Sequence, residues 1–245
     1  MNYYRGRPQG TMRSCMETGD PRKFRNHGLK CVLSPGVGQT LVSSVISAWS
    51  DFSGTTADWT QGTAGRRPAV SEGGADFDGT DDFLAGPVLN TVITASAYTV
   101  ILATMVDAVD TNTGATYLND AIIGDGNTEL FGIYLKSAPT AHAYNWDGSD
   151  DHADVSISTG AKFILTTRHG SGALGIRVNN GSEVTASSGD TTGIAHAAQM
   201  ARGAGSDADC FDGKVYAAVI FDTHVADDIQ RRIRKAVAAR VGVAV

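Results

Sequence analysis

The sequence is poor in glutamate, in cysteine and in long apolar runs, and each shortage excludes a class of protein. Only four of its 245 residues are Glu, whereas Gly occurs 29 times, a balance that does not suit a helical fold. The cysteines, Cys15, Cys31 and Cys210, have the spacing of neither a disulfide framework nor a zinc site. Free thiols are expected, with a Cys15–Cys31 bridge as the alternative. No stretch approaches the ~18 apolar residues of a membrane span.

Catalytic signatures are also missing. Residues 33–40, LSPGVGQT, imitate a phosphate-binding loop but carry Gln39 where that loop needs its lysine. There is no Gly-x-Ser-x-Gly elbow, and the four glutamates are isolated rather than paired as in a glycosidase. The histidines show no metal-binding spacing, so each is expected to be a surface or hydrogen-bonded polar residue: His27, His142, His152, His169, His196 and His224. We therefore predict a protein that is not an enzyme and has no catalytic residues.

Charge is unevenly distributed along the chain. Residues 1–35 carry seven cationic side chains against Glu17 and Asp20, although the formal net charge of the whole chain is −6. Because this segment has three prolines and no apolar period, we expect an extended basic arm that lies against the body of the chain or a neighbouring subunit. An acidic body is not expected to bind nucleic acid. The predicted partner-docking residues are Arg5, Arg7, Arg13, Arg22, Lys23 and Arg25.

From about residue 36 the pattern indicates a single all-β domain that ends in a helix. Residues 41–49 are a mixed apolar segment, and apolar runs predict strands at 98–106, 121–124, 130–136, 162–168 and 215–221. Residues 175–185 predict a hairpin around Asn180-Gly181, a pair that favours a type I′ turn with positive φ at both positions. Ile229, Ile233 and Val237 form the apolar stripe of a helix over about 226–240. On that helix Arg231, Arg232, Arg234 and Lys235 are expected on the other faces.

The segment 145–154, NWDGSDDHAD, is the candidate ligand loop. Its Trp146 offers a flat apolar surface on which a sugar could stack, and Asn145, Asp147 and Asp151 could bond sugar hydroxyls. Asp147 and Asp150 supply hard oxygen ligands of the kind that calcium prefers. The alternative is a solvated turn with a structural tryptophan. Apart from calcium, no cofactor is expected.

The stretch FDGTDDFL at 77–84 packs three aspartates between two phenylalanines. The family resemblance described next implies that it is a strand, a turn and a strand, with Phe77 and Phe83 pointing into the core. Asp78 and Gly79 would make the turn, and the aspartate side chains would bond nearby backbone N–H groups. Turn chemistry then explains the acidity without a metal ion.

Four segments in order resemble the concanavalin A-like, laminin-G-like jelly-roll domains over about residues 41–243. The first contains Trp49, Asp51, Ser53, Gly54, Asp58, Gln61, Arg67 and Pro68. The others are ADFDGTDDFLAG, the IRVNNGSEVT hairpin, and the closing FDGKVYAAVIF strand with its helix. Ala218 departs from the resemblance, because many relatives carry Glu in the last strand.

The resemblance implies a two-sheet antiparallel jelly-roll sandwich over 36–245 with one C-terminal α-helix, preceded by the arm over 1–35. It also implies non-enzymatic recognition, often of carbohydrate. Similar domains occur among phage structural proteins. Because no signal peptide is visible and the arm is basic, we expect a capsid decoration, head fibre or tail component. Such a protein would be made in the host cytoplasm and displayed on the virion surface as part of a larger assembly, with virion proteins and cell-surface glycans as partners. The alternatives are a free-standing lectin-like module and a degenerate glycoside hydrolase.

Overall fold

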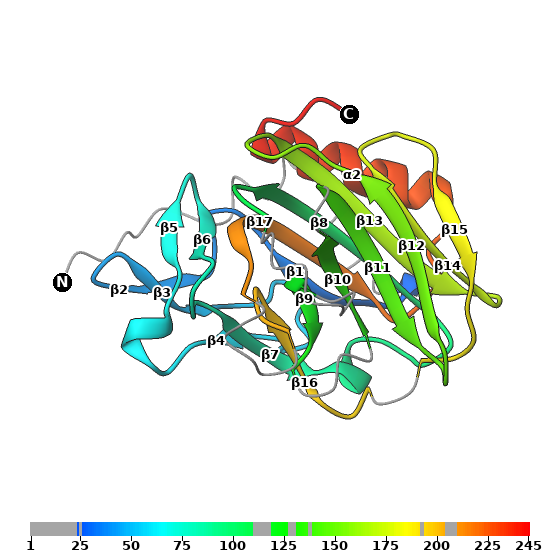
Figure 1. Cartoon of the computed structure of the whole chain (residues 1–245). Helices are drawn as coiled ribbons and strands as arrows, with labels where there is room; N and C mark the ends of the chain where they lie inside the picture. The colour runs from blue at the N-terminus through cyan, green and yellow to red at the C-terminus, as the bar shows by residue number, and fades with distance from the viewer. Residues whose placement is uncertain are drawn as a thin grey trace.

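The computed structural model describes residues 24, 26–109, 119–126, 131–136, 139–191, 194–203 and 210–245. The elements in chain order are β1 (Leu29–Leu33), β2 (Gln39–Val42), β3 (Val45–Trp49), β4 (Trp59–Thr60), η2 (Ala64–Arg66), β5 (Ala69–Ser71), β6 (Gly74–Asp78), β7 (Leu84–Val88), η3 (Leu89–Thr91), β8 (Tyr98–Val106), β9 (Asn119–Asp125), β10 (Phe131–Lys136), β11 (Thr140–Trp146), β12 (Asp150–Ser156), β13 (Lys162–Gly170), β14 (Ala173–Val178), β15 (Val184–Ser187), β16 (Ala197–Met200), β17 (Asp212–Phe221) and α2 (Asp227–Val241) (Figure 1). Each strand that the sequence predicts is present, with bounds shifted by a few residues.

The strands form one continuous hydrogen-bonded network that folds into two layers. The first layer has the order β15-β14-β13-β8-β17, and both β1 and β6 pair with the remaining side of β17. From β6 the network passes through β5, β3 and β4 into the second layer, β7-β16-β9-β10-β11-β12. The prediction of an all-β antiparallel protein with a C-terminal helix is confirmed. Two separate jelly-roll sheets are not seen, because β5, β3 and β4 join the layers into a nearly closed sandwich.

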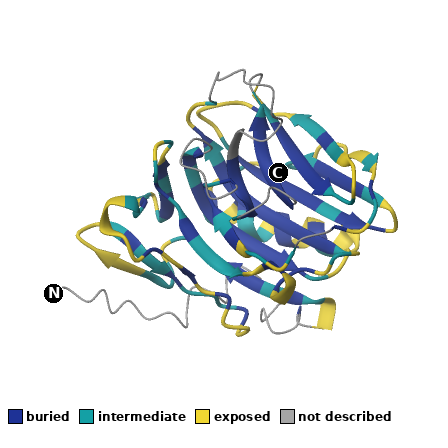
Figure 2. Cartoon of the chain, turned by 60° about the horizontal axis from the view of Figure 1, so that its bottom comes forward, coloured by how far each residue is buried: buried dark blue, intermediate teal, exposed yellow. Residues whose placement is uncertain are grey.

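The main core fills the space between the layers, and strand alternation decides which residues enter it. In β10, for example, Phe131, Ile133 and Leu135 are at most 2% exposed and all belong to this core. Strand β8 is buried on both faces, as its continuous apolar sequence predicts. Its second face contributes Ile101 and Ala103 to another cluster beneath the helix. Figure 2 shows the buried residues concentrated in the strands and the exposed ones in turns and hairpin ends.

Helix α2 covers the outer face of the first layer, over β8 and β13 (Figure 1). The predicted stripe is confirmed: Ile233 is buried, and Ile229 and Val237 pack against the same cluster. Arg234 is an exception to the predicted polar faces, because only 2% of it is exposed. Its guanidinium donates to the side-chain oxygen of Gln230, 3.3 Å away, and burial lowers its pKa. No helix in the described ranges is long and apolar enough to span a membrane.

The domain begins earlier than the sequence predicts. Residues 29–33, assigned to the arm, are strand β1, which pairs with β17 from Leu29 opposite Phe221 to Leu33 opposite Ala218. Cys31 and Leu33 lie in the main core. Five apolar-rich residues were too few to show a period in the sequence, but the β17 edge holds them by backbone hydrogen bonds. Cys31 is a free thiol, so the alternative of a Cys15–Cys31 bridge does not hold.

The β14–β15 hairpin is confirmed, but its turn differs from the predicted one. The strands pair from Ala173 opposite Ser187 to Ile176 opposite Val184, which leaves a longer connection than a two-residue turn. Positive φ occurs at Asn179 (52°) and not at Asn180 or Gly181. The Asn179 side-chain oxygen accepts from the backbone N–H of Ile164 at 2.8 Å, and its own N–H donates to the Ile164 carbonyl at 2.7 Å. These bonds to β13 hold Asn179 in place, so the chain reverses direction one residue before the predicted turn at Asn180-Gly181.

Residues of the jelly-roll resemblance hold loops together. The Asp51 carboxylate accepts from the backbone N–H groups of Val32 at 2.7 Å and Ser53 at 2.8 Å. It thereby joins β1 to the loop that follows β3. The Trp49 indole is fully buried and donates to the Val37 carbonyl at 3.1 Å. These side chains are structural, which explains why they are recognisable in the sequence without marking a ligand site.

The FDGTDDFL stretch is a strand, a turn and a strand, as predicted, with Gly79 at φ 71° in the turn. Phe77 is 1% exposed and lies in the core. Phe83 is only half-buried, and Leu84 takes the core position instead. The Arg202 guanidinium lies 4.6 Å from the Phe83 ring centroid. The prediction that both phenylalanines point inward is therefore wrong for Phe83, because the turn shifts the strand alternation by one residue.

Candidate functional site

The segment 145–154, predicted as a ligand loop, is the end of a hairpin. Trp146 is the last residue of β11 and Asp150 the first of β12, with only three residues between them. Gly148 has φ 118°, a backbone conformation that L side chains rarely adopt. Because neighbours on a strand point to opposite sides, the hairpin separates side chains that a loop could have brought together.

Asn145 does not face solvent. It is 0% exposed, and its side-chain amide donates to the Ser188 hydroxyl at 2.6 Å and to the Gly189 carbonyl at 2.9 Å. Its oxygen accepts from the Thr191 hydroxyl. Both N–H groups and the carbonyl oxygen are thus engaged within the protein. The prediction of Asn145 as a sugar ligand is corrected: it anchors the segment after β15 to β11.

Asp147 and Asp151 also take part in the hairpin's own structure. Asp147 accepts from the Ser149 hydroxyl at 2.8 Å and from the Gly189 N–H at 2.8 Å, and these bonds lower its pKa. Asp151 lies opposite Asn145 in the register and accepts from the Ser149 hydroxyl at 3.3 Å. Their role in sugar binding stays a prediction, as does calcium binding by Asp147 and Asp150.

A polar and aromatic surface lies on the outer side of β10, β11 and β12, where each strand's alternate residues leave the core. The aromatic face consists of Tyr134, Lys136, His142, Tyr144, Trp146, Asp150, His152 and Asp154. Across the strands, Tyr134 is aligned with His142 and Asp154, and Tyr144 with His152. The Tyr134 and Tyr144 rings meet edge to face, with 6.1 Å between their centroids.

The end of the aromatic face nearest the hairpin turn is accessible. Trp146 and His152 are half-buried and Asp150 is exposed, whereas Tyr134 is fully buried. Trp146 packs on the small cluster that contains Tyr134 and Tyr144. The Tyr144 hydroxyl donates to Asp150 at 2.7 Å. This end therefore combines a supported indole, a phenol and a carboxylate, which together can offer a stacking surface and hydrogen-bonding groups.

Further along the aromatic face a buried histidine is paired with a partly exposed carboxylate. The His142 ring binds Asp154 through Nδ1, and the Lys136 ammonium lies 3.1 Å from the other Asp154 oxygen. Burial lowers the pKa of His142 to about 4, so the ring is neutral at physiological pH. The prediction of a surface or hydrogen-bonded histidine is therefore confirmed for His142 through its Nδ1. Its Nε2 is buried and has no hydrogen-bond partner among the described residues.

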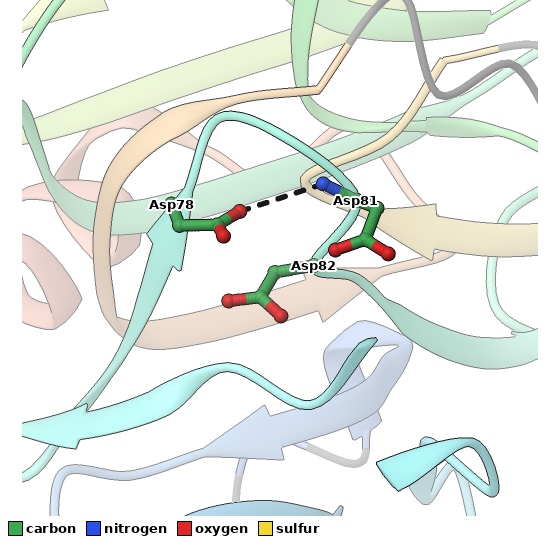
Figure 3. Close-up of side chains that lie close together, drawn as sticks. All are labelled: Asp78, Asp81 and Asp82. Carbon is green, nitrogen blue, oxygen red and sulfur yellow. Dashed lines mark hydrogen bonds between the residues drawn. The ribbon is translucent and has the colours of Figure 1, made fainter. Parts of the chain in front are cut away.

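A second candidate is the carboxylate cluster of Asp78, Asp81 and Asp82 (Figure 3). One oxygen of each lies within 4.8 Å of the others, and this is the only such group of three metal-ligating side chains among the described residues. Asp78 accepts from the backbone N–H groups of Thr80 and Asp81, as turn chemistry predicts. Asp82 is 8% exposed, and burial with the charges of Asp78 and Asp81 raises its pKa to about 6. The geometry could accept a cation, but it can equally hold a proton.

Most of the aromatic face was not predicted from the sequence. A pattern that indicates it is present in residues 140–146, where His142, Tyr144 and Trp146 alternate with Ala141 and Ala143. That period of two predicts a strand with one small, buried side and one aromatic side. The predicted docking arginines and lysine of the arm, residues 5 to 25, lie outside the described residues.

The sequence matches no protein-family model and no curated protein. Among solved structures, a Trypanosoma rangeli sialidase in complex with sialic acid is 15% identical with a TM-score of 0.59, over 87% of this chain and 33% of the sialidase. The binding domain of Paraclostridial Mosquitocidal Protein 1 is 10% identical with a TM-score of 0.59, over 85% of this chain and 52% of that one.

A third structure is Domain 4 of AbnA, a GH43 extracellular arabinanase from Geobacillus stearothermophilus, in complex with arabinotriose. It is 15% identical with a TM-score of 0.54, over 85% of this chain and 98% of that domain. At these identities the likeness shows the fold alone: a β-sandwich similar to part of a sialidase and to a domain of an arabinanase. The chain spans only about a third of the sialidases' length.

Proposed function

We propose that this chain is a non-enzymatic carbohydrate-binding module that binds sugar on the accessible end of the aromatic face. The observation that carries the proposal is the β11–β12 register, which places Trp146, Tyr144, Asp150 and His152 on one surface. Sugars present apolar faces that stack on aromatic rings and hydroxyls that need donors and acceptors. The fold supports the proposal, because one similar structure is a domain in complex with arabinotriose.

The carboxylates of the aromatic face support binding rather than hydrolysis. A glycosidase acid needs a raised pKa so that it carries a proton at working pH. Although burial opposes ionisation, the hydrogen bonds from His142 and Lys136 lower the pKa of Asp154. Asp154 would therefore be ionised and act as a hydrogen-bond acceptor.

Calorimetry with arabinotriose and a glycan array, on the wild type and on Trp146→Leu, tests the proposal. Leu keeps an apolar side chain but removes the flat ring, so binding should fall about two- to tenfold, since stacking contributes ~0.5–1.5 kcal/mol. Phe52→Ala is the matched control, because Phe52 is another half-buried aromatic and packs on the cluster beneath α2. Glycan binding that survives Trp146→Leu unchanged, with or without EDTA, would move the site elsewhere.

A second candidate function, hydrolysis, is favoured by one observation: Asp82, with a pKa of about 6, lies next to Asp78 and Asp81. Two close carboxylates, one of them protonated, are what a retaining glycosidase uses. A turnover assay on polysaccharides with the wild type and Asp82→Asn separates the two functions. Turnover that is lost in Asp82→Asn would establish the enzyme instead of the binding module.

The finer prediction of a virion surface protein anchored by its basic arm remains a proposal. It rests on the cationic residues of the first 25 positions. Purified virions from a producing host, probed with an antibody against the domain, would test it. Labelling that is lost when residues 1–23 are deleted would support anchoring through the arm, and the absence of any labelling would remove the virion role.

A further inference from the structure

We infer that the aromatic face selects uncharged saccharides and rejects acidic ones such as sialic or uronic acids; this inference rests on the proposed carbohydrate binding. The starting observation is the charge of the hairpin itself. Residues 140–156 contain Asp147, Asp150, Asp151 and Asp154 but no Lys or Arg. A ligand that stacks on Trp146 therefore lies beside Asp150, its partner across the two strands, while Asp147 in the turn and Asp151 on the Asn145 side add negative charge at the same end of the hairpin.

Three of these four carboxylates have no cationic partner among the described residues. Within the described part of the chain, Lys136 is the cation that pairs with one of them, and its partner is Asp154. Asp147, Asp150 and Asp151 form no ion pair there; their hydrogen bonds come from neutral hydroxyl and N–H groups. Of these, Asp150 is aligned with Trp146 on the outer side and is exposed, so the accessible end of the face carries an acceptor and a negative charge beside the indole.

The chemistry of that surface fits a neutral sugar. Ionised carboxylates accept hydrogen bonds from sugar hydroxyls, and such charge-assisted bonds are stronger than neutral ones. A ligand carboxylate has no proton to donate at neutral pH and is repelled by each fixed charge. At separations of about 7 Å and intermediate dielectric, each like charge weakens binding several-fold, so a selectivity of at least about tenfold is expected at low salt.

The selectivity would contrast with that of the sialidase whose fold is similar. That enzyme is seen in complex with sialic acid, a carboxylate-bearing sugar. A site for such a ligand needs cationic side chains that match the carboxylate. None of the residues on the accessible end of the aromatic face supplies a permanent cation. The shared fold therefore does not predict a shared ligand class here.

The test uses oligosaccharide pairs that differ by a carboxylate: galactotriose with trigalacturonate, and lactose with sialyllactose, together with arabinotriose. Calorimetry is done on the full chain at about 20 mM and about 500 mM salt. The neutral member should bind at least about tenfold more tightly at low salt, and the ratio should shrink at high salt. Equal or tighter binding of the acidic member would overturn the inference while leaving carbohydrate binding intact. No binding of any probe would remove the proposed function and the inference with it.

Two variants locate the effect. Asp150→Asn keeps an acceptor for the Tyr144 hydroxyl but removes a charge beside Trp146, so the neutral-to-acidic ratio should fall about threefold. Asp228→Asn makes the same change of charge on an exposed residue of α2, which covers the other layer, and should leave the ratio unaltered. A ratio that changes equally in both variants would mean that net charge, and not this surface, sets the preference.

Discussion

The raised pKa of Asp82 predicts how the free energy of unfolding depends on pH. Its carboxyl is 8% exposed and faces the charges of Asp78 and Asp81, so folding raises its pKa from 3.8 to about 6. Between these two pH values the folded state binds the proton and the unfolded state releases it. The free energy of unfolding must therefore fall as pH rises through this window, and the loss is fully present above it. Each pKa unit corresponds to about 1.4 kcal/mol, which sets a ceiling of about 3 kcal/mol on the loss.

Asp82→Asn removes the charge but keeps the shape and an acceptor oxygen. At about pH 7 the variant should be more stable than the wild type by ~1–3 kcal/mol, and the difference should vanish near pH 4. Urea unfolding of both proteins at a series of pH values measures this directly. Asp81→Asn is the matched control: it relieves only part of the repulsion and also loses the pairing with Arg66. A variant that is no more stable at neutral pH, or whose advantage is independent of pH, would refute the reasoning.

Calcium distinguishes a metal site from turn chemistry in the same cluster. Asp78 already bonds two backbone N–H groups, Asp81 pairs with Arg66, and Asp82 has a hydrogen bond with the Asp78 backbone. We expect millimolar calcium to leave the thermal melting of the wild type unaltered, because calcium takes about six to eight oxygen ligands and these three carboxylates already have partners. Stabilisation by calcium that Asp82→Asn abolishes would establish a cation site.

Three further changes test the fold. Asn145→Ala should cost ~2–3 kcal/mol in urea unfolding, because it leaves the polar groups of Ser188, Gly189 and Thr191 without a buried partner. Asn179→Val should cost ~1–3 kcal/mol, since a β-branched residue is strained at φ 52° and cannot accept from Ile164; an unchanged melting temperature would contradict the turn. Deleting residues 1–35 should abolish cooperative melting, because it removes β1 from the core, whereas deleting residues 1–23 should not.

Much of the fold could be predicted from local pattern. Strands such as Tyr98–Val106 are long apolar runs, and the terminal helix has a regular stripe, so each is visible in a short window. The short strand β1 could not be predicted, because its partner is β17, almost two hundred residues away. The joining of the two layers through β5, β3 and β4 likewise depends on pairings that no local period encodes.

The candidate site was harder to predict because it depends on which side of the sheet each side chain faces and not on how close the residues are in sequence. Asn145 and Trp146 are neighbours in the chain, yet one is buried behind the layer and the other lies on its outer surface. Conversely, Tyr134 and Asp154 are distant in sequence but aligned across β11. The buried Nε2 of His142 could not be anticipated, since only the packing of neighbouring strands removes it from water.

The pairing of β8 with β17 has a consequence for synthesis on the ribosome. β8 forms its ladder with β17 over Val106 opposite Gly213 to Thr99 opposite Phe221, so more than a hundred residues separate the partners. β1 also pairs with β17 and has no partner until that strand has been made. Until residue 221 has left the exit tunnel, one edge of β8 and the whole of β1 lack their partner, and these apolar segments stay open to wrong pairing. The two layers of the sandwich therefore cannot be completed one after the other as the chain emerges. The sandwich closes only after its last strand, β17, has been made.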